Sequence, residues 1–421
     1  RAIICADAAE TYDAPATMLA LRDEVTTLEH VIVATGDAPD NALSLRSLIE
    51  DGTSHAIENA PVASDPAILC FTSGTSSAPK AVVHSYQTML ANNRIAAPIY
   101  GLTADDVVLG GPPFTHAFGL CVLNFTLMAG ATSLLMPAFS PPGLIDLIEN
   151  GKPTVAFVAP AHVAACMKSG HLDRGDLSSI RIATISGSAC PPDVAYALEK
   201  AMPNGAVGQM WGMTECFMGL HTPFDGPADI RCETLGSTTP TFEARMVLEN
   251  GDIAPDGQEG EFEIRGCSVI AGYFNNADAN RTAFTGDGWF KTGDLACRDE
   301  NGSVLITGRA KDLINRGGIK INPVDIEAVI DRHAAVLMSA IAPIPDDILG
   351  ERACVYIELQ PECSVSLEEI CDWLKENDVA RMKWPEKLKI ISQMPLTPTR
   401  KIIKGELATA KALYHRNAVL K

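Results

Sequence analysis

The chain has 421 residues, of which 47% are hydrophobic and 20% are charged, and its formal net charge is −19. These values are typical of a folded globular protein, and the length allows two or more structural units. The acidic balance argues against nucleic acid as a primary partner, because a phosphate backbone requires a basic surface. No apolar run approaches the ~18 residues of a membrane-spanning helix, and the first residues lack the pattern of a signal peptide.

The twelve cysteines are predicted to be free thiols. None forms a C-x-x-C pair, and none lies in a cluster of cysteine and histidine with metal-ligand spacing. Most lie inside apolar runs, as Cys70 and Cys121 do, where a thiol packs like a small hydrophobic side chain. Buried free thiols are typical of a reducing compartment, so we expect a cytoplasmic protein without an integral membrane segment.

Predicted strands and helices alternate through the first half of the chain. Residues 1–60 show an α/β pattern, and strand-like runs then recur at AILCF, KAVVHS, VVLGG, TSLLM, TVAFVAP and IRIATISG. Ser85 is a predicted helix N-cap, and the helical segments PPGLIDLIENG and PPDVAYALEKAM each have proline near their start. Such alternation predicts a largely parallel sheet covered by helices.

The pattern changes after about residue 230. The strand-like runs FEARMV, EFEIRG and SVLITG are separated by turn signals, which predicts a small antiparallel β unit. In the last part of the chain, Asn322 and Pro323 mark a predicted helix start. We therefore predict an α/β fold, with a large N-terminal domain of helix-covered sheets plus a small β unit, and a small α+β C-terminal domain.

The loop Thr72-Ser73-Gly74-Thr75-Ser76-Ser77-Ala78-Pro79-Lys80 lies between two predicted strands. Its amides and hydroxyls can donate hydrogen bonds to phosphate oxygens, and Lys80 adds a cation. The spacing differs from the common P-loop, because Ala81 follows the lysine. A flexible polar surface loop is the alternative, and this motif alone does not decide between them.

A second motif is Gly208-Gln209-Met210-Trp211-Gly212-Met213-Thr214-Glu215. A carboxylate such as that of Glu215, next to a phosphate site, indicates Mg²⁺, which prefers oxygen ligands. Taken alone, an exposed glutamate in a turn is the simpler interpretation.

A third motif pairs Asp294, in the segment GWFKTGDL, with Arg309 in GRAKD. An aspartate at a strand end can accept hydrogen bonds from both ribose hydroxyls, and the arginine can reach the sugar or a phosphate. The alternative is a hairpin with solvated charges.

A fourth motif is the basic loop PLTPTRKIIK at residues 395–404, which is unusual on so acidic a protein. A solvated tail is the alternative interpretation of this segment. Each of the four motifs is weak by itself, whereas their order along the chain is hard to match by chance.

In these motifs, over residues 65–410, the chain resembles the adenylate-forming (AMP-binding) superfamily, and within it the acyl-CoA synthetase branch. The resemblance implies a large AMP-binding domain over residues 1–310, with a β-rich subdomain at about 231–308. It also implies a mobile C-terminal lid domain over residues 311–421, which rotates about the hinge residue Lys311 between two half-reactions. Family members have a longer region before the Ser/Thr/Gly-rich loop, so we expect an N-terminal part to be missing from this sequence.

The resemblance also implies a set of cofactor-binding residues. They are Thr72, Ser73, Gly74, Thr75, Ser76, Lys80, Gly187, Ser188, Ala189, Gln209, Met210, Trp211, Gly212, Met213, Thr214, Asp294, Arg309 and Lys320.

Among them, Thr214 would contact the α-phosphate, Glu215 would hold Mg²⁺, and Asp294 would bind the ribose with Arg309 beside it. Trp211 stands where the family usually has tyrosine, and it would offer an aromatic face for stacking on adenine.

Further departures from the family pattern lie in the first and fourth motifs. Ser77 and Ala81 replace glycines of the phosphate-binding loop, which should stiffen that loop without removing its donors. Arg400 stands where the family usually has glycine, immediately before the expected catalytic lysine.

The resemblance implies Lys401, Thr214 and Glu215 as the catalytic residues. In the first state the Lys401 ammonium would stabilise negative charge as the carboxylate attacks the α-phosphorus. In the second state the loop Asn315-Arg316-Gly317-Gly318-Ile319-Lys320 would turn inward, and Gly317 and Gly318 would suit a narrow pantetheine tunnel.

His116 and Gly119 would lie at the acyl pocket and the mouth of this tunnel. A packed pocket-wall histidine that transfers no proton is an equally good interpretation of His116. The expected pocket residues, around positions 116–120, 162–166, 185–189 and 213–220, are mainly apolar. With Ala117 after the histidine, the sequence favours an apolar acid, either medium-chain, alicyclic or aromatic.

We therefore expect an enzyme that forms acyl-AMP and pyrophosphate from a carboxylic acid and ATP·Mg²⁺, and then an acyl-CoA thioester with release of AMP. The alternatives are an enzyme that loads a carrier-protein thiol and a non-catalytic nucleotide-binding relative. The expected partners of this enzyme are the acid, ATP and CoA, and no nucleic acid. A homodimer is a possible assembly.

Overall fold

The computed structural model describes residues 1–7, 12–52, 60–72, 79–397, 401–407 and 412–414. Contacts divide the chain into two compact units, Arg1–Pro61 and Val62–Lys421.

The first unit is a small α/β element. Its three strands form a parallel sheet in the order β1-β2-β3. Helix α1 begins after Asp13, whose side chain accepts a hydrogen bond from the amide of Ala16. The elements are β1 (Ala2–Cys5), α1 (Ala14–Glu24), β2 (His30–Val33), β3 (Leu43–Ser44) and α2 (Leu45–Glu50).

The second unit is built around a seven-stranded sheet in the order β12-β11-β10-β9-β8-β6-β7. The strands from β10 to β7 are parallel, and β11 and β12 add antiparallel partners at one edge. The strands are β6 (Val107–Gly110), β7 (Thr132–Leu135), β8 (Val155–Val158), β9 (Ile182–Ile185), β10 (Ala206–Met213), β11 (Phe217–His221) and β12 (Ser237–Thr238).

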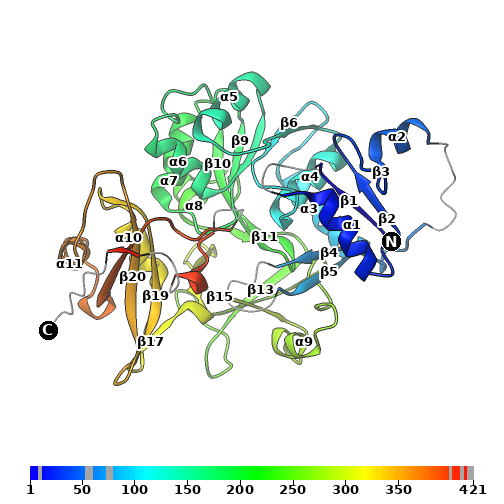
Figure 1. Ribbon diagram of the computed structural model, residues 1–421. Helices are drawn as coiled ribbons and strands as arrows, with labels where there is room; N and C mark the ends of the chain where they lie inside the picture. Colours follow the sequence, from blue (N-terminus) through cyan, green and yellow to red (C-terminus); the bar gives the residue numbers. More distant parts are fainter. Residues whose placement is uncertain (8–11, 53–59, 73–78, 398–400, 408–411, 415–421) are drawn as a thin grey trace. The chain divides into compact units, whose positions relative to one another are not determined.

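Helices cover both faces of this sheet (Figure 1). Alternate residues of β8 point to opposite faces, so Ala156 and Val158 pack with one helix layer, whereas Val155 and Phe157 pack with the other. The first layer contains α5 (Pro141–Gly151), α6 (Pro160–Lys168), α7 (Pro192–Ala201) and α8 (Ala228–Glu233). The second contains α3 (Tyr86–Ile99) and α4 (Ala117–Ala129).

The helix starts follow the sequence signals. Ser85 caps α3 by accepting a hydrogen bond from the amide of Thr88 at 3.1 Å, and α5 and α7 both begin at proline. These predicted boundaries are therefore confirmed.

The predicted strands AILCF and KAVVHS form a separate antiparallel pair, β4 (Pro66–Phe71) and β5 (Ala81–Ser85). The predicted antiparallel β unit is a four-stranded sheet in the order β13-β14-β15-β16. Its strands are β13 (Phe242–Val247), β14 (Gly260–Gly266), β15 (Phe290–Arg298) and β16 (Val304–Arg309), and helix α9 (Ala277–Ala283) lies between β14 and β15 in the chain. One apolar cluster joins both sheets, since Val82 of β5 packs with Phe262 and Phe290.

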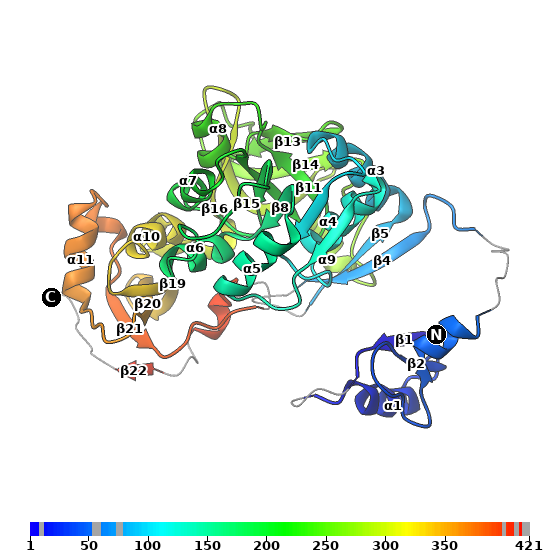
Figure 2. The same cartoon turned by 90° about the horizontal axis from the view of Figure 1, so that it is seen from above.

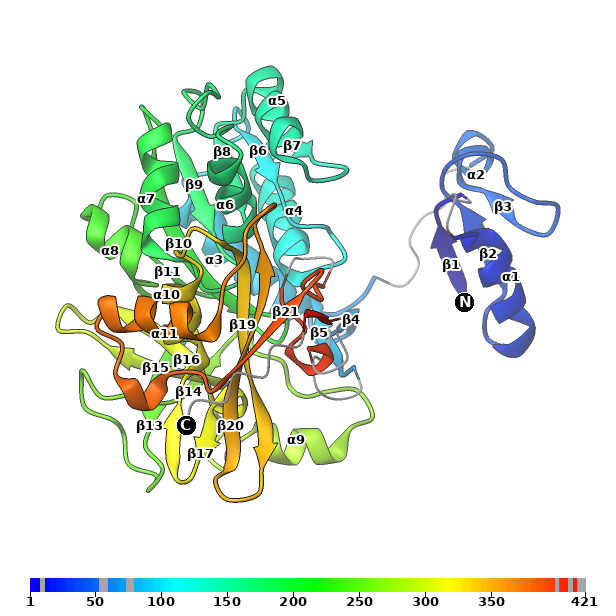
Figure 3. The same cartoon turned by 60° about the vertical axis from the view of Figure 1, so that its left-hand side comes forward.

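The last part of the chain is an α+β unit around the long antiparallel pair β19 (Val336–Asp346) and β20 (Gly350–Leu359) (Figure 3). The helices α10 (Pro323–Ile330) and α11 (Leu367–Glu376) lie beside this pair (Figure 2). The remaining strands are β17 (Ile314–Arg316), β18 (Ile319–Ile321), β21 (Lys387–Ile391) and β22 (Ala412–Tyr414), and three short 3₁₀ turns lie at Ala310–Asp312, Arg381–Lys383 and Lys404–Glu406. The predicted N-cap Asn322 accepts a hydrogen bond from the amide of Val324.

Candidate active site

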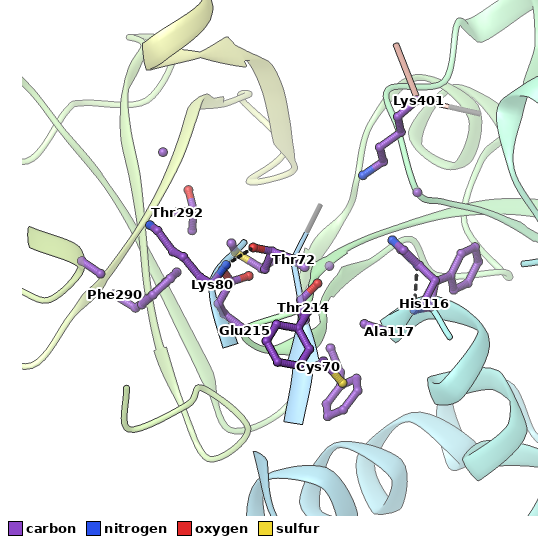
Figure 4. A pocket seen from close by; sticks show the side chains of 18 of the residues that line it. Cys70, Thr72, Lys80, His116, Ala117, Thr214, Glu215, Phe290, Thr292 and Lys401 are labelled. Atoms are coloured by element: carbon purple, nitrogen blue, oxygen red, sulfur yellow. Dashed lines mark hydrogen bonds between the residues drawn. The ribbon is translucent and has the colours of Figure 1, made fainter. Parts of the chain in front are cut away.

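A cavity of about 610 Å³ lies at the carboxyl ends of β9 and β10. This is the edge of an open parallel sheet at which ligands commonly bind. Segments from the seven-stranded sheet, the β4–β5 pair, the four-stranded sheet and the C-terminal part all reach it. Figure 4 shows Thr72, Lys80, Thr214 and Glu215 close together, with Lys401 and His116 on the other side of the cavity.

The predicted phosphate-binding loop is anchored beside this cavity. The amide of Thr72 donates to the carbonyl of Lys80 at 3.0 Å, and the amide of Lys80 donates to the Thr72 hydroxyl at 3.2 Å. These bonds hold the two ends of the loop together. The intervening predicted residues Ser73, Gly74, Thr75 and Ser76 lie outside the described residues.

Glu215 is only 6% exposed, although it lines the cavity. The hydroxyl of Tyr273 donates a hydrogen bond to its Oε1 at 2.9 Å. Burial raises the pKa of the Glu215 carboxyl, and the Tyr273 hydrogen bond, Lys80 and Arg309 oppose that rise. These three groups favour the ionised carboxylate, which is the form that binds a cation.

The residues beside Glu215 fit Mg²⁺ held jointly with a nucleotide. Among the described residues, no three His, Cys, Asp or Glu side chains gather into a complete metal site. Mg²⁺ is commonly bound by one or two carboxylates together with substrate phosphates, rather than by a cage made only of protein. Glu215 supplies such a carboxylate, and Lys80 lies on the same side of the cavity (Figure 4).

The carbonyl of Thr214 is hydrogen-bonded to His84, a fully buried histidine of β5. His84 Nε2 lies 2.7 Å from this carbonyl oxygen, so Nε2 carries the proton and donates. Burial lowers the pKa of His84. A neutral histidine thus helps to set the position of the Thr214–Glu215 turn.

Asp294 is 4% exposed and is held by two donors. Arg309 Nε lies 2.9 Å from Oδ1, and the indole nitrogen of Trp211 donates to Oδ2 at 2.9 Å. Arg309 lines the cavity, whereas Asp294 and Trp211 are not among its lining residues. The Trp211 ring packs edge-on against Phe262, with centroids 5.0 Å apart, so its stacking on adenine stays a prediction.

Lys401 lines the cavity and is joined to Thr397 by two hydrogen bonds. The amide of Thr397 donates to the carbonyl of Lys401 at 2.8 Å, and the amide of Lys401 donates to the Thr397 hydroxyl at 3.0 Å. Residues 398–400, which include Arg400, lie outside the described part of the chain. Burial and the nearby Arg309 lower the pKa of Lys401, and Asp294 and Glu215 partly oppose this.

His116 is the N-cap residue of α4, and its Nδ1 accepts a hydrogen bond from the amide of Phe118 at 3.2 Å. This contact requires an unprotonated Nδ1. Burial, with a smaller effect of Lys401, lowers the pKa of His116 to about 4. His116 is therefore neutral near pH 7, as expected for a histidine of the pocket wall.

A second cavity of about 290 Å³ adjoins the first and shares His116, Gly187 and Lys401 with it. His162 stacks on Phe139 along its wall, with ring centroids 4.4 Å apart. The remaining lining is mainly apolar or small, namely Gly111, Pro112, Pro113, Phe118, Met136, Pro137, Ala138, Ala159, Ala161, Ser186 and Ser188.

The structure brings together only some of the predicted site residues. Twelve of them line the larger cavity, namely Thr72, Lys80, His116, Gly187, Met210, Gly212, Met213, Thr214, Glu215, Arg309, Lys311 and Lys401. Ser188 lines the smaller cavity, whereas Ala189, Gln209 and Gly119 line neither. A Cβ at Gly119 would lie 2.3 Å from the carbonyl oxygen of Pro113, so this glycine lets α4 pack against the preceding loop.

Gly317, Gly318 and Lys320, which were predicted to act in thioester formation, line neither cavity. Gly317 and Gly318 form the turn between β17 and β18, with φ of 59° and 92°. Lys320 of the same hairpin pairs with Glu249, in the turn after β13. The roles of these three residues in thioester formation stay predictions.

Tyr273, His84 and Phe139 contribute to the site but were missed by sequence reasoning. Tyr273 lies in the segment AGYFNN, which resembles an ordinary turn, and His84 lies inside a strand. A polar side chain within an apolar strand was the available signal for His84.

Comparison with known proteins identifies the family. Residues 1–274 match the AMP-binding enzyme family, and residues 325–401 match the AMP-binding enzyme C-terminal domain. The chain belongs to the AMP-binding enzyme family.

Two relatives and one solved structure illustrate the similarity. The chain is 32% identical to 2-hydroxy-7-methoxy-5-methyl-1-naphthoate–CoA ligase of Streptomyces carzinostaticus, covering 97% of this chain and 75% of that one. It is 30% identical to medium-chain fatty-acid–CoA ligase of Escherichia coli K12, covering 92% and 69%. ATP-bound MatB from Rhodopseudomonas palustris aligns with a TM-score of 0.84 and 26% identity, covering 96% of this chain and 78% of MatB.

These matches confirm the predicted adenylate-forming superfamily, its acyl-CoA synthetase branch and the α/β fold class. This AMP-forming acid–CoA ligase uses ATP, Mg²⁺ and CoA, as the sequence predicted. No described helix is long and apolar enough to cross a membrane.

Proposed function

We propose that the larger cavity activates an apolar carboxylic acid as its acyl-adenylate, and that the enzyme then transfers the acyl group to CoA. The observation that carries this proposal is the position of Lys401, because its partly buried side chain lines the same cavity as Thr72, Lys80 and Glu215. The cations around this cavity complement the negative phosphates of a nucleoside triphosphate, and the carboxylate complements its metal ion.

In the first half-reaction, the acid's carboxylate attacks the α-phosphorus of ATP and pyrophosphate leaves. Lys401 would stabilise the negative charge that develops on the transferring group, and Lys80 would hold the departing phosphates. Bound at Glu215, Mg²⁺ would add charge neutralisation on the phosphate oxygens. Thr214, whose carbonyl His84 fixes, would contact the α-phosphate.

In the second half-reaction, the CoA thiol attacks the acyl carbonyl and AMP leaves. We propose that residues 311–421 form a lid domain on the large domain of residues 1–310, with the hinge at Lys311. Rotation about Lys311 would withdraw Lys401 and bring Gly317, Gly318 and Lys320 toward the site. Closure in both states would protect the acyl-adenylate from water.

The smaller cavity is the proposed acyl pocket. It adjoins Lys401 and is lined mainly by apolar and small side chains, with the His162–Phe139 stack along one wall. Relatives named for a naphthoate and for medium-chain fatty acids agree with a medium-chain, alicyclic or aromatic acid as substrate.

The deciding experiment is carboxylate-dependent exchange of labelled pyrophosphate into ATP, without CoA, over linear, alicyclic and aromatic acids. Exchange with one class, followed by AMP and thioester on addition of CoA, supports the proposal. Thioester on a phosphopantetheinylated carrier protein but not on CoA would replace the proposed acceptor. No exchange by a folded preparation that binds ATP would reject adenylation of these acids.

We further propose a cytoplasmic location, which is supported by twelve free cysteines. A homodimer is also proposed, and light scattering during size-exclusion chromatography tests it.

A further inference from the structure

The side chain of Tyr273 contacts both Glu215 and Lys80. Its hydroxyl donates to Glu215 Oε1 at 2.9 Å, and the ammonium of Lys80 lies 4.7 Å from the centroid of its ring. Tyr273 lines the cavity but is only 6% exposed. The phenol therefore contacts both the carboxylate proposed for the metal and the cation proposed for the phosphates.

The backbone of Tyr273 is fixed by two neighbouring elements. Its amide donates to Asn280 Oδ1 at 2.7 Å, and Asn280 Nδ2 donates back to its carbonyl at 3.1 Å. The next amide, that of Phe274, donates to the carbonyl of Ala81, directly after Lys80. The backbone that carries the ring is therefore held by hydrogen bonds to both elements.

Glu215 is fixed on the same side. Its carbonyl accepts a hydrogen bond from the amide of Ile270 at 3.0 Å, three residues before Tyr273. One short segment, Ile270–Tyr273, thus holds both the backbone and the side chain of Glu215. A carboxylate that accepts a hydrogen bond at Oε1 keeps the acceptor capacity of its second oxygen, in a fixed orientation.

We propose that Tyr273 is a positioning residue that holds the Glu215 carboxylate and the Lys80 ammonium in one fixed arrangement for ATP·Mg²⁺. The proposal rests on the proposed roles of Glu215 and Lys80. The hydroxyl orients the metal ligand, and the negative face of the ring attracts the ammonium. Each contact has a separate consequence, because one needs the oxygen and the other needs only the ring.

The test uses isothermal titration of the full chain with ATP, once with EDTA and once with saturating Mg²⁺, in the absence of acid. The ratio of the two dissociation constants measures what the metal adds to nucleotide affinity. In Tyr273→Phe the ring remains and the hydroxyl is lost. We expect the Mg²⁺-dependent gain to fall by about 10- to 100-fold, as for other groups that orient metal ligands. The affinity for metal-free ATP should stay within about twofold of the wild type.

Tyr196→Phe is the matched control. Tyr196 also donates to a glutamate, Glu233 Oε1 at 2.7 Å, but this pair lies on α7 and α8, outside both cavities. This variant loses the same chemical contact, so its Mg²⁺-dependent gain should equal that of the wild type. Thermal unfolding of both variants checks that each is folded.

Two further variants distinguish a wrong role for Tyr273 from a wrong role for Glu215. Tyr273→Leu also removes the ring, so it should weaken metal-free ATP binding as well. Glu215→Gln should abolish the Mg²⁺-dependent gain if Glu215 binds the metal. A full gain in Tyr273→Phe, together with a lost gain in Glu215→Gln, would overturn the positioning role alone. A full gain in Glu215→Gln would overturn the proposed metal ligand itself.

Discussion

The indole nitrogen of Trp211 donates a hydrogen bond to Asp294 Oδ2 at 2.9 Å, across 83 positions of sequence. The ring lies against Gly219, where a Cβ would approach the indole to 2.8 Å. Tryptophan therefore acts here as a hydrogen-bond donor to the proposed ribose ligand, which a phenylalanine of similar shape could not do.

Trp211→Phe should raise the KM for ATP about tenfold, because a hydrogen bond to a buried carboxylate is lost. The wild-type preference for ATP over 2′-deoxy-ATP should also shrink, since Asp294 would be less well oriented toward the ribose. Pyrophosphate exchange with each nucleotide measures both effects. Trp289→Phe is the control, because Trp289 packs on Arg245 and Arg265 and is not among the residues that line the cavity. If Trp211→Phe keeps the wild-type preference for ATP over 2′-deoxy-ATP, Trp211 does not orient Asp294 toward the ribose.

Lys401→Ala should lower pyrophosphate exchange on the order of 10²- to 10³-fold, because a fixed charge at the α-phosphate is lost. Formation of acyl-CoA from chemically prepared acyl-AMP should be spared. Stopped-flow or quenched assays of the two half-reactions measure this separately. Equal loss in both would show that Lys401 is not specific to adenylation.

The rate of adenylation should depend on the protonation of Lys401. Burial lowers its pKa below the usual 10.5, so the charged form is lost on the alkaline side at a lower pH than for an exposed lysine. The exchange rate should fall as pH rises through this pKa. In Lys401→Arg, whose guanidinium stays charged, the residual rate should show no such fall. The same fall in both variants would assign it to another group.

His116 should not titrate near neutral pH. Its pKa of about 4 means that it is uncharged from pH 6 upward, and the positive form appears only as pH falls through about 4. His116→Gln should therefore leave the shape of the pH–rate profile between pH 6 and 8 unchanged, even if the rate itself changes. A transition near pH 6.5 in the wild type that this variant removes would contradict the neutral pocket-wall role.

Ala161→Leu should narrow the smaller cavity, because Ala161 lies on α6 and lines its wall. We expect kcat/KM to fall about tenfold or more for bicyclic or medium-chain acids and to change little for short acids. The KM for ATP should not change. A uniform loss over all acids would indicate that this cavity does not hold the acyl group.

The sequence alone determined the elements and the order of the motifs. Continuous apolar runs such as VAFV, and caps such as Ser85 and Asn322, depend on neighbouring residues, so local pattern was sufficient to place them. Those motifs also placed Lys80, Glu215 and Lys401 in one expected site. Local pattern did not decide the pairing of β4 and β5, because the same apolar pattern fits a strand of the parallel sheet and a strand of a separate antiparallel pair.

Only the tertiary structure decided how the site residues are held. His84 meets the Thr214 carbonyl across 130 positions, and Tyr273 meets Glu215 across 58. Trp211 donates a hydrogen bond to Asp294 and is not among the residues that line the cavity. Such contacts arise because distant strands and turns pack against one another, and periodicity along the chain carries no information about which distant side chains will meet.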